Sequence, residues 1–136
     1  MFEFFEHTAD LGLRVRASDL DTLYREAAEG LFAILVENVP ASATEETLEF
    51  RIEGQRPDFV LFDWLNELLF TFETRHLLMR GFDVRSDARG LTGGARAQPL
   101  DPVRHRLLHE VKAITYHGLK VERSTGGWLA EIIVDI

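Results

Sequence analysis

The residues from Asp58 to Phe72 carry apolar side chains over most of the circumference of a helix. Their spacings of three and four residues form one face, made of Phe59, Phe62, Leu65, Leu69 and Phe72, which is widened by Val60, Leu61, Trp64 and Leu68. An apolar arc of this breadth is too wide for a surface helix. We therefore expect this helix to be nearly engulfed, lying across a sheet as the centre of the core, with Asp58 after Pro57 as its N-cap.

A second helix is indicated between residues 18 and 35. Ser18, followed three residues later by Asp21, resembles a capping box. Apolar residues then recur at helical spacing through Leu20, Leu23, Tyr24, Ala27, Leu31, Ile34 and Leu35. The segment is therefore expected to bury one face against the rest of the domain.

The remaining segments have the patterns of strands. Leu11, Leu13, Val15 and Ala17 alternate with polar or small residues, and residues 2–7 are the expected neighbouring strand, with a turn at residues 8–10. Further strands are expected at residues 44–52, 81–87, 91–97, 109–116, 119–123 and 128–135, and residues 90–102 as a hairpin and loop. These elements predict an α+β fold: one domain spanning residues 1–136, with two main helices packed on one side of a mixed, largely antiparallel β-sheet.

Composition narrows the classes of function. The chain has 136 residues, a formal charge of −8 and no cysteine, which excludes disulfides, thiolate zinc sites and a cysteine nucleophile. The N-terminus has no basic region before an apolar run, and no segment is long and apolar enough to cross a bilayer, so we expect a cytoplasmic protein without membrane contact. Residues 1–74 carry a net charge of −11 and residues 75–136 one of +3, so a locally basic face is conceivable in the second half.

The common nucleotide and metal motifs are absent from the sequence. There is no Gly-x-Gly-x-x-Gly, Walker-type or Gly-x-Ser-x-Gly motif, and Gly93-Gly94 and Gly126-Gly127 are typical of hairpin turns rather than phosphate loops. His105 and His109 stand four residues apart, but no third zinc ligand follows at helical spacing. We interpret this pair as part of a solvated basic loop.

Carboxylates near the two ends of the chain form a candidate metal site. Asp10 ends the segment His7-Thr8-Ala9-Asp10, and an apolar strand runs directly into Asp135 and Ile136. If that strand lies beside the turn at Asp10, two side-chain carboxylates and the α-carboxylate of Ile136 converge, and such oxygen ligands suit Ca²⁺ or Mg²⁺. The alternatives are an Asx-turn at Asp10 and neutralisation of the terminus by Lys112 or an arginine.

A third candidate segment runs from Val111 to Gly118. In a strand, Lys112, Ile114 and Tyr116 would share one face, and Ala113, Thr115 and His117 the other. Lys112 would then either protect an edge strand from aggregation or reach a phosphate or an acidic partner.

Together these segments resemble the archease family. The resemblance rests on His7-Thr8-Ala9-Asp10-Leu11-Gly12, Asp63-Trp64-Leu65-Asn66-Glu67-Leu68-Leu69, Val111-Lys112-Ala113-Ile114-Thr115-Tyr116-His117-Gly118 and Val134-Asp135-Ile136, in this order. It spans nearly the whole chain. The arginine-rich segment 90–106 departs from the pattern, so no function is transferred to it.

The resemblance implies a non-catalytic accessory protein. Archeases assist the RtcB-type RNA ligase in tRNA splicing and RNA repair by promoting ligase guanylylation and turnover, which leaves indirect contact with tRNA or a guanine nucleotide open. It further implies a divalent-metal site at Asp10, Asp135 and Ile136, usually occupied by Ca²⁺, with Mg²⁺ or Mn²⁺ as alternatives. Lys112, and with less support His7 and His117, are the implied residues of a partner surface.

Two functions of other classes remain open. A stand-alone metal-dependent phosphoesterase or nuclease could use the same carboxylates, with His7 as the only nearby base in the sequence. A nucleic-acid chaperone could work through the basic second half.

Overall fold

The computed structural model describes residues 1–7 and 10–136, except for the side chain of His7. Its elements follow the order β1 (Phe2–His7), β2 (Asp10–Ala17), α1 (Leu20–Leu35), β3 (Glu46–Glu53), α2 (Pro57–Arg75), β4 (Leu77–Asp87), β5 (Gly90–Pro99), β6 (Ala113–Ile114), β7 (Lys120–Ser124) and β8 (Gly127–Asp135). Two helices with eight strands confirm the α+β class.

The strands form two sheets instead of the single sheet expected. One sheet has the order β1-β2-β8-β6, with β7 also paired to β8, and the other has the order β3-β5-β4. Every strand pairing in the described part of the chain is antiparallel, so the expectation of a mixed sheet was wrong. The chain reaches the second sheet after α1 and returns to the first through the segment after β5, so sequence order alone does not separate the sheets.

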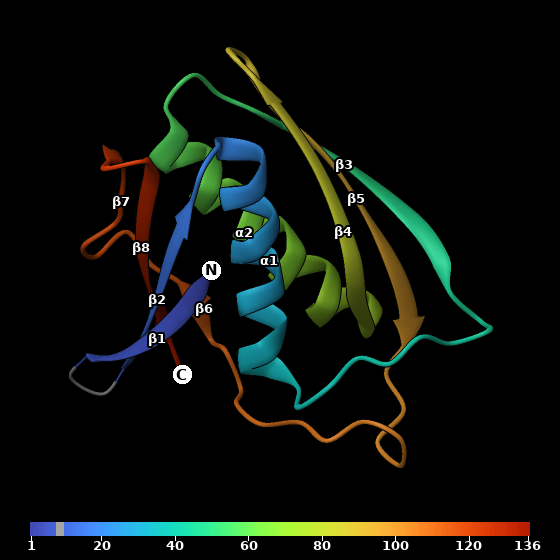
Figure 1. Cartoon of the computed structure of the whole chain (residues 1–136). Coiled ribbons are helices and arrows are strands. Elements are labelled where there is room, and N and C mark those ends of the chain that lie inside the picture. Colours follow the sequence, from blue (N-terminus) through green and yellow to red (C-terminus); the bar gives the residue numbers. More distant parts are fainter. Residues whose placement is uncertain (8–9) are drawn as a thin grey trace.

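Both helices lie between the two sheets (Figure 1). α1 packs on β2 on one side and on β4 on the other, while α2 contacts all three strands of the smaller sheet and also β6 and β7. Trp64 of α2 is fully buried in this middle layer, and its indole N–H donates a hydrogen bond of 3.0 Å to the carbonyl of Tyr24 in α1. Each sheet therefore has helices on one face only, as an amphipathic sheet requires.

The start of α1 differs from the expected capping box. Asp19, not Ser18, is the N-cap, and its carboxylate accepts a 2.7 Å hydrogen bond from the N–H of Thr22. Asp21 instead accepts hydrogen bonds from the N–H and the hydroxyl of Ser86, at 2.7 and 2.5 Å. Asp21 thus links the first turn of α1 to β4, a contact between residues 65 positions apart in the sequence.

The second helix begins one residue before its expected cap. Arg56 is the N-cap residue, Pro57 occupies the first turn, and Asp58 lies inside the helix. The buried face combines all four residues expected to widen the apolar arc, Val60, Leu61, Trp64 and Leu68, with Leu65 and Leu69 of the expected main face. Phe59 and Phe70 are exposed by 44% and 59%. The helix is therefore not engulfed, because neither sheet covers its outer side.

Two of the strand predictions differ from the structure. Gly93-Gly94 lies inside β5, not in a turn, and the tight turn of that hairpin falls between Asp87 and Gly90. The expected strand at 109–116 is reduced to Ala113–Ile114. Its length is limited because β7 pairs with the same edge of β8, from Lys120 opposite Glu131 to Ser124 opposite Gly127. Gly126, with φ of 79°, makes the β7–β8 turn and confirms the hairpin expected there.

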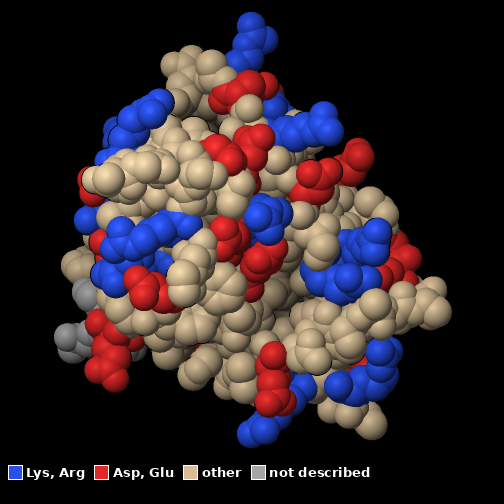
Figure 2. Space-filling view, in the orientation of Figure 1, with Lys and Arg blue, Asp and Glu red and all other residues tan. Residues whose placement is uncertain are grey.

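Charges are mixed over the face of the molecule shown in Figure 2, where neither sign forms a continuous patch. The basic second half of the sequence contributes β4 and β5 to one sheet and β7 and β8 to the other, so its charges are divided between them. Among the described residues, no helix combines the length and the apolar character needed to cross a membrane.

Candidate metal site and the family of the chain

Asp10 and Asp135 lie directly opposite each other at the end of the β2–β8 pairing. The register runs without a shift from Ala17 opposite Trp128 to Asp10 opposite Asp135. Directly opposed residues of an antiparallel pair have Cβ atoms about 4.5–5.5 Å apart. The structure thus brings together two carboxylates from opposite ends of the chain, while their role as metal ligands stays a prediction.

Both acids occupy the outer face of the larger sheet. Leu13 and Val15 of β2 are buried towards the helices, so Asp10, Gly12 and Arg14 alternate to the other side. The aromatic ring of Phe5 covers Gly12, where a Cβ atom would come within 2.3 Å of the ring. The Phe5 ring therefore restricts the access of a ligand to the acid pair from the side of Gly12.

Arg14, which shares this face of β2, is engaged by other acids. Arg14 donates hydrogen bonds of 3.0 Å to Glu131 and 3.3 Å to Glu3, and Lys120 lies 3.0 Å from Glu131. Burial raises the pKa of Glu131, but the hydrogen bonds from Lys120 and Arg14 outweigh it, so the pKa lies below its ordinary value. Arg14 is therefore held by Glu131 and Glu3, four strand positions from the acid pair.

Lys112 contacts Asp135 through a main-chain hydrogen bond. Its N–H donates a 2.7 Å hydrogen bond to the carbonyl of Asp135, and the next residue, Ala113, pairs opposite Asp135. Its side chain lines a depression of about 480 Å³ between the end of α2 and the segment before β6, together with Phe72, Glu73, His76, Glu110 and Val111. Lys112 thus stands next to the candidate site without being part of the β6 ladder.

The other three candidate residues have different positions. Ile136 follows Asp135 directly, and its side chain packs partly buried against the core. His117 lies in an exposed turn beyond Thr115, which is already about 7 Å along the strand from Asp135, so the structure does not bring it to the acid pair. His7 pairs with Asp10 in the β1–β2 register, but its side chain and residues 8–9 lie outside the described part of the chain.

A buried polar network was missed by the sequence analysis. His105 is 3% exposed, not solvated as expected, while His109 is exposed. The His105 Nδ1 accepts a 2.9 Å hydrogen bond from the N–H of Asp101, so its Nε2 donates to the Gln98 side-chain oxygen at 3.1 Å. Nothing in the local sequence distinguishes these two histidines; burial separates them because His105 faces Gln98, which is 1% exposed.

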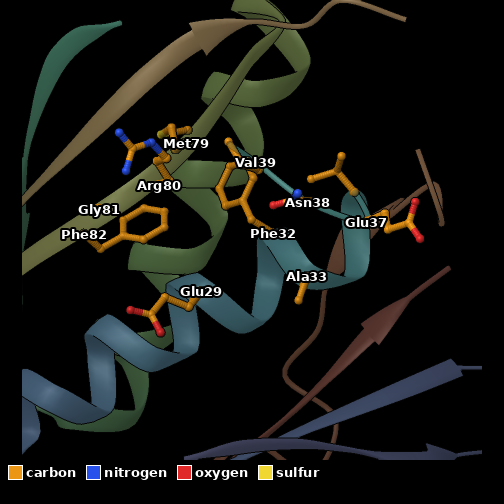
Figure 3. A pocket seen from close by; sticks show the side chains of 11 residues that line it. Glu29, Phe32, Ala33, Glu37, Asn38, Val39, Met79, Arg80, Gly81 and Phe82 are labelled. Carbon is orange, nitrogen blue, oxygen red and sulfur yellow. The ribbon is translucent and has the colours of Figure 1, made fainter. Parts of the chain in front are cut away.

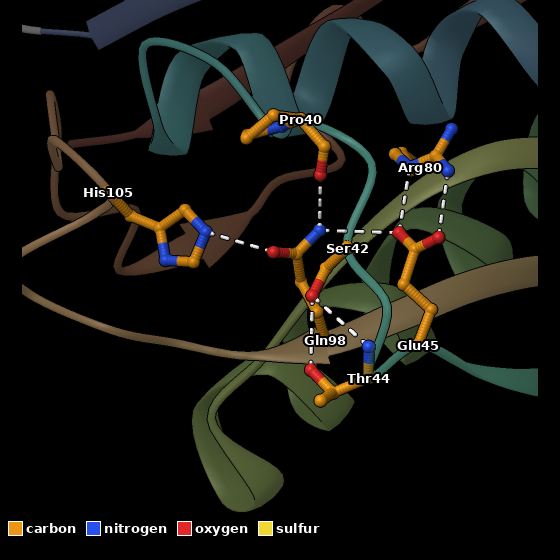
Figure 4. A network of polar contacts seen from close by, with 7 residues as sticks. All are labelled: Pro40, Ser42, Thr44, Glu45, Arg80, Gln98 and His105. Carbon is orange, nitrogen blue, oxygen red and sulfur yellow. Dashed lines mark hydrogen bonds and ion pairs between the residues drawn. The ribbon is translucent and has the colours of Figure 1, made fainter.

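From Gln98 on β5 the network continues to the segment before β3 and to Arg80 of β4 (Figure 4). The Gln98 amide donates to the carbonyl of Pro40 at 2.6 Å and to Glu45 at 3.2 Å. Glu45 accepts two hydrogen bonds of 2.7 Å from Arg80, and this pairing keeps the pKa of Glu45 below its usual value. The arrangement fastens the segment between α1 and β3 to the sheet.

A pocket of about 310 Å³ lies between the second half of α1, the segment after it and β4. Figure 3 shows the apolar side chains of Phe32, Val39 and Phe82 in this pocket, with Glu29 and Glu37 also among its lining residues. Arg80 lines the pocket, but its guanidinium is held by Glu45. With two acids and a neutralised arginine, the pocket does not resemble a phosphate site.

Two carboxylates alone do not complete a metal site. Among the described residues, no group of three or more His, Cys, Asp or Glu side chains is arranged to hold an ion. The oxygen chemistry of Asp10 and Asp135 nevertheless fits a hard cation, provided that main-chain or terminal oxygens and water supply the remaining ligands.

The family model and the curated relatives match this chain over nearly its whole length. Residues 2–136 match the model of the archease protein family (MTH1598/TM1083). Protein archease of Methanopyrus kandleri is 41% identical over 99% of both chains, and that of Pyrococcus abyssi is 36% identical over 99% of this chain and 98% of its own.

Solved structures show the same fold. The solution structure of Methanobacterium thermoautotrophicum protein 1598 has a TM-score of 0.77 and 31% identity, covering 99% of this chain and 98% of its own. The crystal structure of an archease from Thermotoga maritima, described as a possible chaperone, has a TM-score of 0.66 and 20% identity, covering 100% of this chain and 98% of its own. With this family match and these relatives, the chain belongs to the archease family.

Proposed function

We propose that this protein is a non-catalytic activator of an RtcB-type RNA ligase in tRNA splicing and RNA repair. In this role it promotes guanylylation and turnover of the ligase through a divalent-metal-binding tip. The observation that supports the proposal most is the placement of Asp10 opposite Asp135 on the outer face of a sheet. Two carboxylates at facing positions of adjacent strands present oxygen atoms close together, and such oxygens are the ligands that a hard cation prefers.

In the proposed site, the carboxylates of Asp10 and Asp135 and the α-carboxylate of Ile136 hold the ion, with Ca²⁺ the first candidate and Mg²⁺ or Mn²⁺ the alternatives. When bound, such an ion supplies positive charge for neutralising phosphate oxygens during guanylyl transfer. The chain's own contribution is to hold the acids at a fixed spacing at the end of the paired strands β2 and β8. Lys112, whose N–H bonds to Asp135 and whose side chain lines the depression beside the end of α2, is the proposed contact with the ligase or a phosphate.

The proposal is tested by measuring ligase guanylylation with purified protein and Ca²⁺. Asp10→Asn and Asp135→Asn keep the side-chain shape and remove the charges, so each should reduce activation at least tenfold. Glu49→Gln, which removes an exposed carboxylate on β3, should activate like the wild type. Full activation by both Asn variants, with folding confirmed by circular dichroism, would contradict the metal-tip model.

The alternative functions predict different outcomes. A stand-alone phosphoesterase or nuclease would cleave RNA with Mg²⁺ in the absence of ligase. A nucleic-acid chaperone would bind tRNA at low salt through Lys and Arg contacts, and its affinity would fall steeply as salt is added.

A further inference from the structure

The outer side of α2 carries a cluster of exposed aromatic residues. Tyr116, in the turn after β6, is 60% exposed, and Phe59 and Phe70 are exposed by 44% and 59%. Phe62, partly buried, joins Phe59 to Tyr116. Phe70 lies on the same face of α2, eight residues after Phe62, and exposed aromatic side chains grouped on one face of a folded domain mark an interaction site. We call Phe59, Phe62, Phe70 and Tyr116, with Arg56, the α2 aromatic surface.

The side chains of the α2 aromatic surface pack against one another and so fix each other's positions. Tyr116 stacks on Phe62 with ring centroids 3.8 Å apart and an interplanar angle of 15°, and it meets Phe59 edge-on at 6.1 Å. The Arg56 guanidinium lies 4.3 Å from the Phe59 ring centroid and is itself held by Asp58 at 2.8 Å. Aromatic and arginine side chains that are fixed before binding lose little entropy on association, which is how strong interface contacts arise.

The backbone beneath Tyr116 is also constrained. The N–H of Leu119 bonds to the Tyr116 carbonyl at 3.2 Å, closing a turn in which Gly118 has φ of 65°, a conformation that favours glycine. On the other side, the N–H and hydroxyl of Thr115 both donate to the carbonyl of Ile133, at 3.1 and 2.9 Å. Tyr116 is therefore presented from a rigid turn anchored to β8.

The charges beside the aromatic residues indicate the kind of partner. Asp63, Glu67 and Glu73 are exposed on the same helix. Asp63 lies one turn after Phe59, Glu67 one turn before Phe70, and Glu73 one turn after Phe70. Carboxylates in this position repel a phosphate backbone and attract Lys and Arg. The surface therefore fits a protein that presents an apolar side chain flanked by basic residues, and not an RNA.

The turn that carries Tyr116 directly follows β6, the strand that pairs with β8 at Asp135. Lys112, bonded to Asp135, is four residues before Tyr116, so their Cα atoms are at most about 14 Å apart. An interface of ordinary size, burying about 800 Å² on each partner, is wide enough to span the distance from Tyr116 to Asp135. A partner that reaches around the β6 end of the sheet, from the inner face that carries α2 to the outer face that carries the acids, can therefore contact both.

We propose that the α2 aromatic surface is the docking site through which this protein holds a basic, apolar face of its protein partner. This inference rests on the proposed function, in which that partner is the RtcB-type ligase. It adds a separation of roles: the aromatic surface supplies affinity, and the acid pair supplies activation of the bound ligase.

The separation is tested by measuring both ligase affinity and ligase guanylylation over a range of protein concentrations, with Ca²⁺ present. Tyr116→Ala and Phe70→Ala should each weaken the dissociation constant at least tenfold, while maximal guanylylation at saturating concentration equals that of the wild type. Asp10→Asn should show the reverse, with affinity changed less than threefold and activation lost. Phe4→Ala removes an aromatic ring that is 42% exposed on β1, and should leave affinity within twofold.

The role of the acidic residues beside the aromatic side chains is tested by reversing their charge. Replacing Asp63 and Glu67 together by lysine should weaken ligase binding, and the loss should shrink as salt is raised. Wild-type affinity in the Tyr116→Ala and Phe70→Ala variants, or a loss of tRNA binding in place of ligase binding, would overturn the docking proposal. A wild-type protein that neither binds nor activates the ligase would overturn the proposed function, and the docking inference with it.

Discussion

Single glycines in this protein serve different purposes that only their surroundings reveal. Gly93 and Gly94 are adjacent in β5, and the dipeptide is typical of a turn by sequence alone. In the structure, a Cβ at Gly93 would come within 2.6 Å of the Trp64 ring, whereas one at Gly94 would meet its nearest atom at 3.7 Å. Gly93 therefore makes room for the central tryptophan.

The adjacent glycines allow a matched test at the residue scale. Gly93→Ala should destabilise the protein by about 1–3 kcal/mol, because Trp64 is fully buried, hydrogen-bonded to Tyr24 and unable to move aside. Gly94→Ala should change stability by less than about 1 kcal/mol. Urea unfolding monitored by tryptophan fluorescence measures both, and equal effects would contradict this role of Gly93.

The two histidines at 105 and 109 make a second matched pair. His105→Phe should destabilise the protein by about 2 kcal/mol, because it leaves the Gln98 side-chain oxygen and the Asp101 N–H without their buried partner. His109→Phe, at an exposed position, should stay within about 0.5 kcal/mol of the wild type. Chemical denaturation at pH 7 would measure the difference, and a neutral His105→Phe would show that the network contributes little to stability.

At the scale of elements, one ion pair connects the segment before β3 to β4. Glu45 and Arg80 form two hydrogen bonds of 2.7 Å, and Gln98 adds a third contact from β5. The nearby pair of Glu46 and Arg75 has a single contact of 3.0 Å, with both side chains about half exposed. The first pair is the stronger candidate for a structural role because its geometry is bidentate and shared within a network.

The pH dependence of stability should reveal this difference. The folded-state pKa of Glu45 is lowered by Arg80, so its contribution is present above the ordinary carboxyl pKa and is lost as the pH falls through the folded value. Glu45→Gln should therefore lower the urea midpoint at pH 7 and have progressively less effect below about pH 4. Glu46→Gln, the control, should have little effect at either pH, and a pH-independent loss in Glu45→Gln would contradict the assignment.

At the scale of the whole molecule, the helices lie between two sheets, and one strand pairing brings Asp10 and Asp135 together. β2 and β8 are adjacent for eight residue pairs, and their last pair is the two acids. If a cation binds there, it binds only the folded state, because the acids are distant in an unfolded chain. Folding stability and metal binding are then linked.

Calcium titration of thermal stability tests this linkage without any ligase. A free Ca²⁺ concentration one hundred times the dissociation constant should stabilise the wild type by about 2.7 kcal/mol, or roughly 5–10 °C in midpoint, and a chelator should reverse the shift. Asp10→Asn with Asp135→Asn should abolish the response, while Glu49→Gln should retain it. An equal calcium response in the double Asn variant would place the ion elsewhere.

Sequence patterns by themselves determined the α+β class, the existence of both helices, most of the strands and the family resemblance, because periodicity and local motifs are properties of neighbouring residues. They also identified Asp10 and Asp135 as candidates. Only the tertiary structure decided that the strands form two sheets, that α2 leaves Phe59 and Phe70 exposed, and that His105 is buried. It also decided that Asp10 lies opposite Asp135. Each of these depends on contacts between segments far apart in the chain, which local patterns do not specify.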